Sequence, residues 1–557
     1  MKLLNLLILL GVLFAPQVMA TDAPFYFGVD LSYVNEVEDC GAVYYENGEQ
    51  RDPFELFADH GANLVRARLW HNPDWTDYST LPDVKRTFQR AVDAGIDTLL
   101  DFHYSDNWAD PGRQEVPVAW EDIEDTQALA DTLYQYTYDV LMELHAENLT
   151  PAFVQVGNET NPGMLNVGLD YNDWDRQTVL FNAGIRAVRD FAAETNTHPQ
   201  IILHIAQPEN TGWWFTQAED AGITDFDVIG ISYYPQWSTF SIADMGAQVS
   251  YLRQRFGKDV MVVETGYGWT RDAVNESAGN ILNQGIRGYA FSPEGQRDFL
   301  IDLTQSLISN GGLGIVYWEP AWVSTECSTR WGQGSHWENA TFFDFQNNNE
   351  LLPGADFLNH DYVYPSTFEF DTALVEDETG DVLDAISAFD FTGLYVASDE
   401  NALGLKLTLA GDVYDERGNY LIYFDTTHDS QGATEDVSRR PITAADPYQP
   451  EFRLDITIRD EKGTVNGSYT FNAWIDGDWE AITFTGSALI TADDESVIEL
   501  TIPRALLNNP EQVYLAVVST DNARAHTAAD ILGTSYVPAS WDEDLLLESF
   551  FAYDLAD

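Results

Sequence analysis

Two glutamates in this sequence each follow a short apolar run. The stretch VGNE ends at Glu159, and the stretch VVE ends at Glu264. Two carboxyl groups that face a sugar from opposite sides can break a glycosidic bond, because one protonates the leaving oxygen while the other attacks or orients water. The chain has 91 acidic residues, so two of them could stand at such places by chance. Whether the sequence indicates this chemistry therefore depends on the residues around the two glutamates.

The residues around both glutamates suit a sugar. Asn158 offers an amide that can hold a sugar hydroxyl beside Glu159, and hydrogen bonds to the 2-hydroxyl strengthen in the transition state. Other apolar runs end in the polar and aromatic stretches DFHY, SYYP and YWEP. Core packing explains any single tryptophan equally well. Several of them follow apolar runs, however, and together they favour a sugar-binding groove: Trp70, Trp108, Trp214, Trp237, Trp269, Trp318 and Trp322.

The elements that position these residues alternate between short apolar runs and longer helical segments, which is the order of repeated βα units. We predict helices at 53–60, 83–94 and 242–256, each followed by a glycine. Eight such units predict a (β/α)8 barrel, whose functional groups lie at the carboxyl ends of its strands. An open doubly wound sheet is the alternative, although no glycine-rich phosphate loop supports it. The predicted strands are 27–31, 64–69, 98–102, 152–156, 201–206, 228–233, 260–263 and 314–318.

Beyond residue 362 the helical periodicity fades, and short alternating runs separated by turns predict a β-sandwich accessory domain. We assign residues 1–20 to a signal peptide, 21–362 to the barrel and 363–557 to the sandwich, with 369–381 as the join. Trp474 and Trp479 flank a turn and either form a sugar platform or pack within a hairpin. The predicted strands are 404–409, 420–425, 452–458, 470–475, 497–502 and 513–518.

Composition limits the classes of partner. A net charge of -64 argues against nucleic acid, which needs a basic surface, and 45% hydrophobic residues argue against a disordered acidic tail. The acidity suits either a saline habitat or a generically soluble secreted protein. Lys2, an apolar run and a small-residue ending at Ala20 predict a cleaved signal peptide, hence a secreted or periplasmic protein. We expect no membrane anchor, and the oligomeric state stays open.

Long motifs make the barrel resemble glycoside hydrolase family 53, the endo-β-1,4-galactanases. The motifs cover about residues 25–358 and leave out the C-terminal region, which only weakly resembles the sandwich modules of secreted carbohydrate enzymes. In chain order they are GVDLS at 28–32, VRARLW at 65–70, DFHYSDNWADPG at 101–112, VQVGNET at 154–160, ISYYP at 231–235, VVETGYGWT at 262–270 and YWEPAW at 317–322.

The resemblance implies a retaining enzyme that cuts internal bonds of β-1,4-galactan in pectin. It makes Glu159 the acid/base at the end of strand four and Glu264 the nucleophile at the end of strand seven. A retaining pair lies about 5 to 5.5 Å apart. The alternatives are a same-clan endoglycanase acting on mannan, xylan or cellulose, and a glycan-binding protein without catalysis.

The resemblance also suggests roles for other residues. Arg66 or Arg68 would stabilise Glu264, and spacing alone cannot choose between them because both lie on the same strand face. Tyr233 would hydrogen-bond the nucleophile, and Trp318 would form the floor of a subsite. The predicted substrate-binding residues are Asp30, Arg66, Arg68, Trp70, His103, Trp108, Asn158, His204, Tyr233 and Trp318.

Only two cysteines are present, Cys40 and Cys327, and an exported chain permits their oxidation. The barrel that the resemblance implies brings the loops after its first and last strands together, so we expect a disulfide there rather than two buried thiols. No cofactor is required by a two-carboxylate reaction. Some bacterial relatives hold calcium in late top loops, so structural calcium stays open, but no ligand set can be matched here. An acidic loop with Asp425, His428 and Asp429 is more simply a solvated loop than a cation site.

Overall fold

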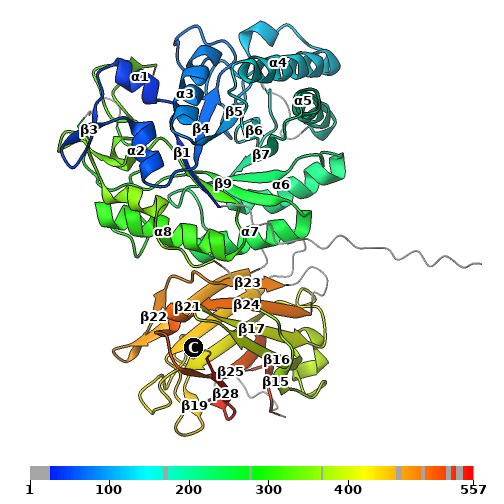
Figure 1. Ribbon diagram of the computed structural model, residues 1–557. Coiled ribbons are helices and arrows are strands. Elements are labelled where there is room, and N and C mark those ends of the chain that lie inside the picture. The colour runs from blue at the N-terminus through cyan, green and yellow to red at the C-terminus, as the bar shows by residue number, and fades with distance from the viewer. Residues whose placement is uncertain are drawn as a thin grey trace, which may run out of the picture.

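The computed structural model describes residues 25–166, 173–274, 279–330, 332–364, 368–458, 467–490, 496–521, 528–534 and 544–555. The predicted signal peptide lies outside these residues. Figure 1 shows two bodies, a barrel surrounded by helices and a separate body of strands below it. In the described part of the chain, no helix combines the length and apolar character needed to cross a membrane.

A closed barrel of eight parallel strands forms the first body, in the spatial order β1-β10-β9-β8-β7-β6-β5-β4. This confirms the predicted (β/α)8 barrel and excludes the open sheet. The observed strand ends lie within two residues of the predicted ones. The strands are β1 (Tyr26–Asp30), β4 (Leu64–Leu69), β5 (Asp97–Phe102), β6 (Phe153–Val156), β7 (Gln200–Ala206), β8 (Val228–Tyr233), β9 (Asp259–Thr265) and β10 (Gly314–Tyr317).

Helices cover the outside of the barrel, and their ends carry local stop signals. The Asp52 side chain accepts from the first amides of one helix, and Ser241 and Asp244 form a capping box on another. Gly257 ends that second helix in the left-handed region at a φ of 61°. The helices are α1 (Val34–Asp39), α2 (Pro53–Asp59), α3 (Leu81–Asp93), α4 (Thr126–Ala146), α5 (Trp174–Thr195), α6 (Pro208–Ala221), α7 (Ile242–Phe256) and α8 (Pro293–Ser309).

A small sheet and a disulfide join segments that follow the first and last barrel strands. A small sheet joins β2 (Tyr44–Glu46) and β3 (Glu49–Arg51) to β13 (Phe343–Asp344) and β14 (Glu350–Leu351). Nearby, Cys40 and Cys327 form the predicted disulfide with their Cα atoms 5.8 Å apart. It links the loops after the first and last barrel strands across 287 residues of sequence.

The inside of the barrel is apolar at one end and polar at the other. Its amino-terminal end is filled by one layer of buried residues, namely Leu64, Leu99, Phe153, Ile202, Val228, Met261, Val263 and Val316. Because side chains alternate between the two faces of a strand, positions two and four residues further on point inward as well. On β4 that sequence is Leu64, Arg66 and Arg68, and on β5 it is Leu99 followed by Asp101. The inward-facing positions near the carboxyl ends of these strands are therefore charged.

The second body is a β-sandwich with a core between two sheets, as predicted. One sheet has the order β15-β16-β17-β24-β23, and the other has β22-β21-β20-β18-β25-β26 with β28 beside β25. The strands are β15 (Ala373–Glu376), β16 (Phe391–Ser398), β17 (Ala402–Leu409), β18 (Gly418–Asp425), β20 (Phe452–Ile458), β21 (Gly467–Ile475), β22 (Asp478–Ile482), β23 (Ser487–Ile490), β24 (Val497–Pro503), β25 (Gln512–Asp521), β26 (Asp530–Ile531) and β28 (Phe551–Asp554).

The sandwich contains strands that the sequence pattern did not reveal. β15 lies inside the segment 369–381, which we expected to be only a join, and it pairs with the unpredicted β16. The ring centroids of Trp474 and Trp479 lie 5.5 Å apart across the β21–β22 hairpin, which supports hairpin packing over a sugar platform. The sandwich contacts helix α7 through β21 and β23 (Figure 1). Asn310 of the barrel also donates to the Gly486 carbonyl at 3.1 Å.

Candidate active site

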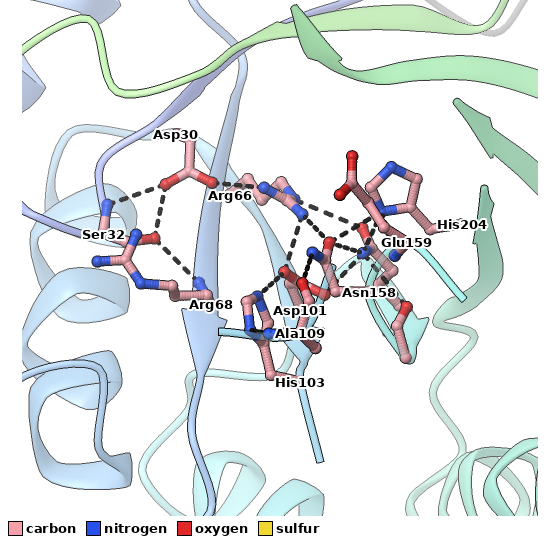
Figure 2. A network of polar contacts seen from close by, with 12 residues as sticks. Asp30, Ser32, Arg66, Arg68, Asp101, His103, Ala109, Asn158, Glu159 and His204 are labelled. Atoms are coloured by element: carbon pink, nitrogen blue, oxygen red, sulfur yellow. Dashed lines mark hydrogen bonds and ion pairs between the residues drawn. The ribbon is translucent and has the colours of Figure 1, made fainter. Parts of the chain in front are cut away.

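A buried arginine organises the polar end of the barrel. Arg66 projects inward from β4 and is 1% exposed. Its Nη1 donates to Asp30 Oδ2 at 2.7 Å, and its Nη2 reaches Asp101 Oδ2 at 2.8 Å and Asn158 Oδ1 at 2.9 Å (Figure 2). The same Nη2 lies 2.8 Å from Glu264 Oε1. Spacing alone could not choose between Arg66 and Arg68 as the partner of Glu264. The contact is made by Arg66, whereas Arg68 pairs with Glu319.

A bulge in strand β9 turns Glu264 into the barrel. Ile231 of β8 faces Val262, whereas the next residue, Ser232, faces Glu264, so Val263 is the extra residue. Val263 already points inward with the apolar layer, and without the bulge its successor would face the helices. The bulge therefore brings the carboxyl group to the inner face. Tyr234 donates its hydroxyl to Glu264 Oε2 at 3.1 Å.

Tyr233 was predicted to be that hydrogen-bond donor, and the structure corrects this. The Tyr233 hydroxyl donates to the Phe240 carbonyl at 2.9 Å, and its ring packs in the core outside the barrel. The reason is strand alternation on β8, where Val228 and Ser232 face inward and Ile229 and Ile231 face outward. Tyr233 continues the outward series and Tyr234 the inward one. The resemblance alone did not separate these neighbours, although the strand parity could have.

Glu159 lies just past the end of β6 in the left-handed region, at a φ of 44°. Ser232 donates its hydroxyl to Glu159 Oε1 at 2.6 Å. His204 stands behind this serine, with Nε2 2.7 Å from Ser232 Oγ, and its Nδ1 accepts the Glu159 amide at 3.3 Å. Burial holds the pKa of His204 well below its usual value, so the ring is neutral. Ser232 is a site residue that the sequence motifs contained but did not single out.

The two glutamates have different electrostatic surroundings. Burial, reinforced by the negative charge of Glu264, raises the pKa of Glu159 to about 8. Burial also raises the pKa of Glu264, but the Arg66 guanidinium opposes this shift and the Tyr234 hydroxyl stabilises the carboxylate. Two interacting acids lose their protons in two steps that belong to the pair. The direct ion pair with Arg66 favours Glu264 as the charged member near neutral pH and leaves the remaining proton on Glu159.

Seven of the predicted substrate-binding residues are buried and do not line the cleft, and Arg66 and Tyr233 are two of them. Arg68 pairs with Glu319 at 2.7 Å and lies against the Tyr33 and Trp108 rings. Asp30 accepts from Ser32 as well as from Arg66. These contacts make them supports of the site. The other five are Asp30, Arg68, Trp70, His103 and His204.

His103 shows why such residues support others. Its Nδ1 accepts the Ala109 amide at 3.1 Å, so the proton is on Nε2, which lies 3.0 Å from Asp101 Oδ2 (Figure 2). Gln155 donates to the other oxygen of Asp101 at 2.6 Å. With both ring nitrogens engaged, His103 holds Asp101 against Arg66. Asp101 belongs to the DFHY stretch noted in the sequence, whereas Gln155 was not singled out, although it faces inward by strand alternation.

A cleft of about 470 Å³ lies above the two glutamates. Three predicted residues, Trp108, Asn158 and Trp318, stand in its wall together with Glu159 and Glu264. Aromatic side chains dominate the remaining wall and offer flat apolar faces of the kind that pack on sugar rings. The aromatic residues that line the cleft are Tyr33, Trp108, Tyr234, Trp237, Trp318, Trp322 and Trp337. A protonated acid and a carboxylate in one aromatic cleft can carry out glycoside hydrolysis.

Comparison with protein families agrees with this geometry. Residues 26–358 match the family model of glycosyl hydrolase family 53. An arabinogalactan endo-beta-1,4-galactanase of Cellvibrio japonicus is 51% identical over 352 residues, which cover 62% of this chain and 93% of that protein. An endo-beta-1,4-galactanase of Bacillus subtilis is 34% identical and is covered over 73% of its length, against 56% of this chain.

Solved structures show the same likeness. A GH53 catalytic domain from Ignisphaera aggregans superposes with a TM-score of 0.56 at 32% identity, covering 62% of this chain and 98% of that domain. One of two fungal beta-1,4-galactanases gives a TM-score of 0.52 at 28% identity, covering 60% of this chain and 98% of its own.

Proposed function

The chain belongs to glycosyl hydrolase family 53, and from this premise we propose that it is a retaining endo-β-1,4-galactanase acting on pectic galactan and type I arabinogalactan. The proposed mechanism rests on the pair Glu159 and Glu264. These two residues line the same aromatic cleft and differ in their electrostatic partners. The names of the relatives support the substrate class. Residues 21–362 would form the catalytic domain and residues 363–557 the accessory domain.

In the first step, Glu264 attacks the anomeric carbon while Glu159 gives its proton to the leaving glycosidic oxygen. The bond between the anomeric carbon and that oxygen breaks, and a glycosyl ester on Glu264 forms. Burial beside the Glu264 carboxylate keeps the Glu159 proton in place until this moment, because two negative charges there would repel each other. Arg66 and Tyr234 hold both oxygens of Glu264 and so fix the direction of attack.

The second step releases the sugar with its original configuration. Forming the ester removes the charge of Glu264, which lowers the pKa of Glu159 and leaves it able to act as a base. Glu159 then takes a proton from water, the resulting oxygen attacks the anomeric carbon, and Glu264 leaves as a carboxylate. Ser232, hydrogen-bonded to Glu159, stabilises the carboxylate form that this step requires. The two acids do this chemistry without a cofactor.

We infer that the protein meets galactan outside the cytoplasm. The apolar segment ending at Ala20 would direct export and be removed, giving a secreted or periplasmic protein. The Cys40–Cys327 disulfide supports this location, because such bonds persist in oxidising compartments.

Reducing-sugar release from unbranched β-1,4-galactan tests the assignment, with mannan, xylan and carboxymethyl-cellulose assayed in parallel. We expect activity on galactan alone, lost in Glu159→Ala and retained in a control such as Asp429→Asn in the accessory domain. Activity only on another glycan would contradict the assignment of galactan as the substrate. Binding to galactan without cleavage by the wild type would make the protein a glycan-binding one.

A further inference from the structure

Three aspartates of the sandwich gather at one end of its core. Asp381 lies between β15 and β16, Asp390 directly precedes β16, and Asp530 begins β26. One carboxylate oxygen of each lies within 4.8 Å of those of the other two. Asp390 is 4% exposed and Asp530 is fully buried. Since β16 and β26 belong to opposite sheets, the cluster spans the sandwich.

Part of each buried carboxylate already holds the backbone. Asp530 Oδ2 accepts the Phe391 amide at 2.8 Å, which ties β26 to the start of β16. Asp390 Oδ2 accepts the Gly380 amide, also at 2.8 Å. In contrast, Oδ1 of all three aspartates is buried and has no hydrogen-bond partner within the described residues. Unpaired carboxylate oxygens therefore remain where the three acids converge.

Such a cluster needs a positive partner or protons. Burying carboxylates together costs free energy, because they lose water and repel one another. Burial and the charges of Asp377 and Asp381 raise the pKa of Asp530 to about 7, and burial raises the pKa of Asp390. A cation at the centre would satisfy the free oxygens and remove the repulsion at once.

The spacing suits calcium. Ca²⁺ binds six to eight oxygen atoms at about 2.3–2.6 Å, so two ligand atoms on opposite sides of it lie roughly 4.6–5.2 Å apart. The three carboxylate oxygens all lie within 4.8 Å of one another, so a single Ca²⁺ can reach all of them. Mg²⁺ is smaller, demands a regular octahedron and usually keeps several waters, so an all-carboxylate protein site suits it less.

We propose that Asp381, Asp390 and Asp530 form a Ca²⁺ site that joins the two sheets of the C-terminal sandwich. Backbone carbonyls and water would complete the coordination. The ion fastens the loop at residues 381–390 to β26 and so stabilises the accessory domain. This role is structural, and it is independent of the cleft and of the proposed galactanase activity.

The other acidic loop of this domain shows the contrast. Both oxygens of Asp425 accept backbone amides, from His428 at 2.6 Å and from Gln449 at 3.3 Å. Asp429, on the same loop, is exposed and accepts the Gln431 amide. We therefore place no cation there, and Asp429 provides a matched control for removing one aspartate charge.

Calorimetric titration of the full chain tests the proposal. The protein is treated with a chelator, dialysed into concentrated sodium chloride to suppress diffuse binding to its acidic surface, and titrated with CaCl₂ or MgCl₂. We expect one saturable Ca²⁺ site per chain and a higher Tm of the sandwich with Ca²⁺. Asp530→Asn and Asp390→Asn should abolish both effects, and Asp429→Asn should retain them.

Several results would contradict the proposed Ca²⁺ site. The wild type, whose folding is not in question, would contradict it by showing neither saturable Ca²⁺ binding nor a change in Tm. Retention of the binding in both Asp530→Asn and Asp390→Asn would also contradict it. Equal affinity for Mg²⁺ would refute the choice of calcium. A higher Tm of Asp530→Asn without added metal, with no Ca²⁺ effect in the wild type, would show that protons neutralise the cluster instead.

Discussion

Replacing Tyr234 with phenylalanine removes one hydroxyl and leaves the ring in the cleft wall. In the wild type this hydroxyl donates to Glu264 Oε2 at 3.1 Å and so favours the charged carboxylate. Its loss must therefore raise the pKa of Glu264. Because the nucleophile works only when it is ionised, activity on the acidic side should be lost at a higher pH in the variant.

The size of this shift follows from the strength of the bond. A hydrogen bond to a charged group contributes about 1.5–3 kcal/mol. At about 1.36 kcal/mol per pKa unit, its complete loss corresponds to a shift of about 1–2 units. Arg66 still holds Oε1 of Glu264 in the variant, and a 3.1 Å contact is not a short one, so we expect about 1 unit.

The assay is the pH profile of kcat/KM on β-1,4-galactan, which reports the pKa values of the free enzyme. The acidic limb should move up by about 1 unit in Tyr234→Phe. The alkaline limb reports the loss of the Glu159 proton, whose pKa lies at about 8, and it should move less. Limb positions are the decisive readout, because the Tyr234 ring also lines the cleft and could affect the overall rate.

Tyr233→Phe is the matched control, since it removes the same atom one residue away. Its hydroxyl donates to the Phe240 carbonyl, so the acidic limb should stay in place while stability falls by about 0.5–1.5 kcal/mol. An unchanged acidic limb in Tyr234→Phe, or an equal shift in Tyr233→Phe, would refute the electrostatic reasoning at Glu264.

Three other perturbations have expected outcomes. Arg66→Met leaves Asp30, Asp101 and Glu264 without their shared cation, so unfolding by urea should show a loss of about 3–5 kcal/mol together with loss of activity; wild-type stability would contradict the ion network. Replacing both Cys40 and Cys327 by serine should cost about 2–5 kcal/mol, and wild type in a reducing agent should match it. With a net charge of -64, the Tm should rise from low to high sodium chloride, and an equal Tm in both would show that repulsion does not limit stability.

Much of the barrel could be predicted from its sequence because each strand is a short apolar run between helix stop signals. Strands buried on both faces read as continuous hydrophobic stretches, and 64–69 and 228–233 were placed at their observed bounds. The sandwich was harder. The Phe391–Ser398 strand contains Gly393 and alternates weakly in burial, and Ala373–Glu376 is short and lies in an acidic stretch, so neither gave a clear signal.

Within the site, residue types were easier to predict than contacts. Glu159, Glu264 and Asn158 came from motifs at strand ends, and the structure brings them to one cleft. The choice of Arg66 over Arg68 depends on depth in the barrel, which alternation does not give. The bulge at Val263 changes which residues of β9 face inward, and a bulge cannot be read from a continuous apolar run.

The anomeric form of the first product tests the central claim most directly. Proton NMR of galactan digestion, recorded before mutarotation, distinguishes β from α ends. We predict that β-galactose ends appear first and convert slowly to the equilibrium mixture, because Glu264 forms a covalent intermediate that water opens from the original face. Initial appearance of α ends would mean direct attack by water, and it would contradict the assignment of Glu264 as nucleophile.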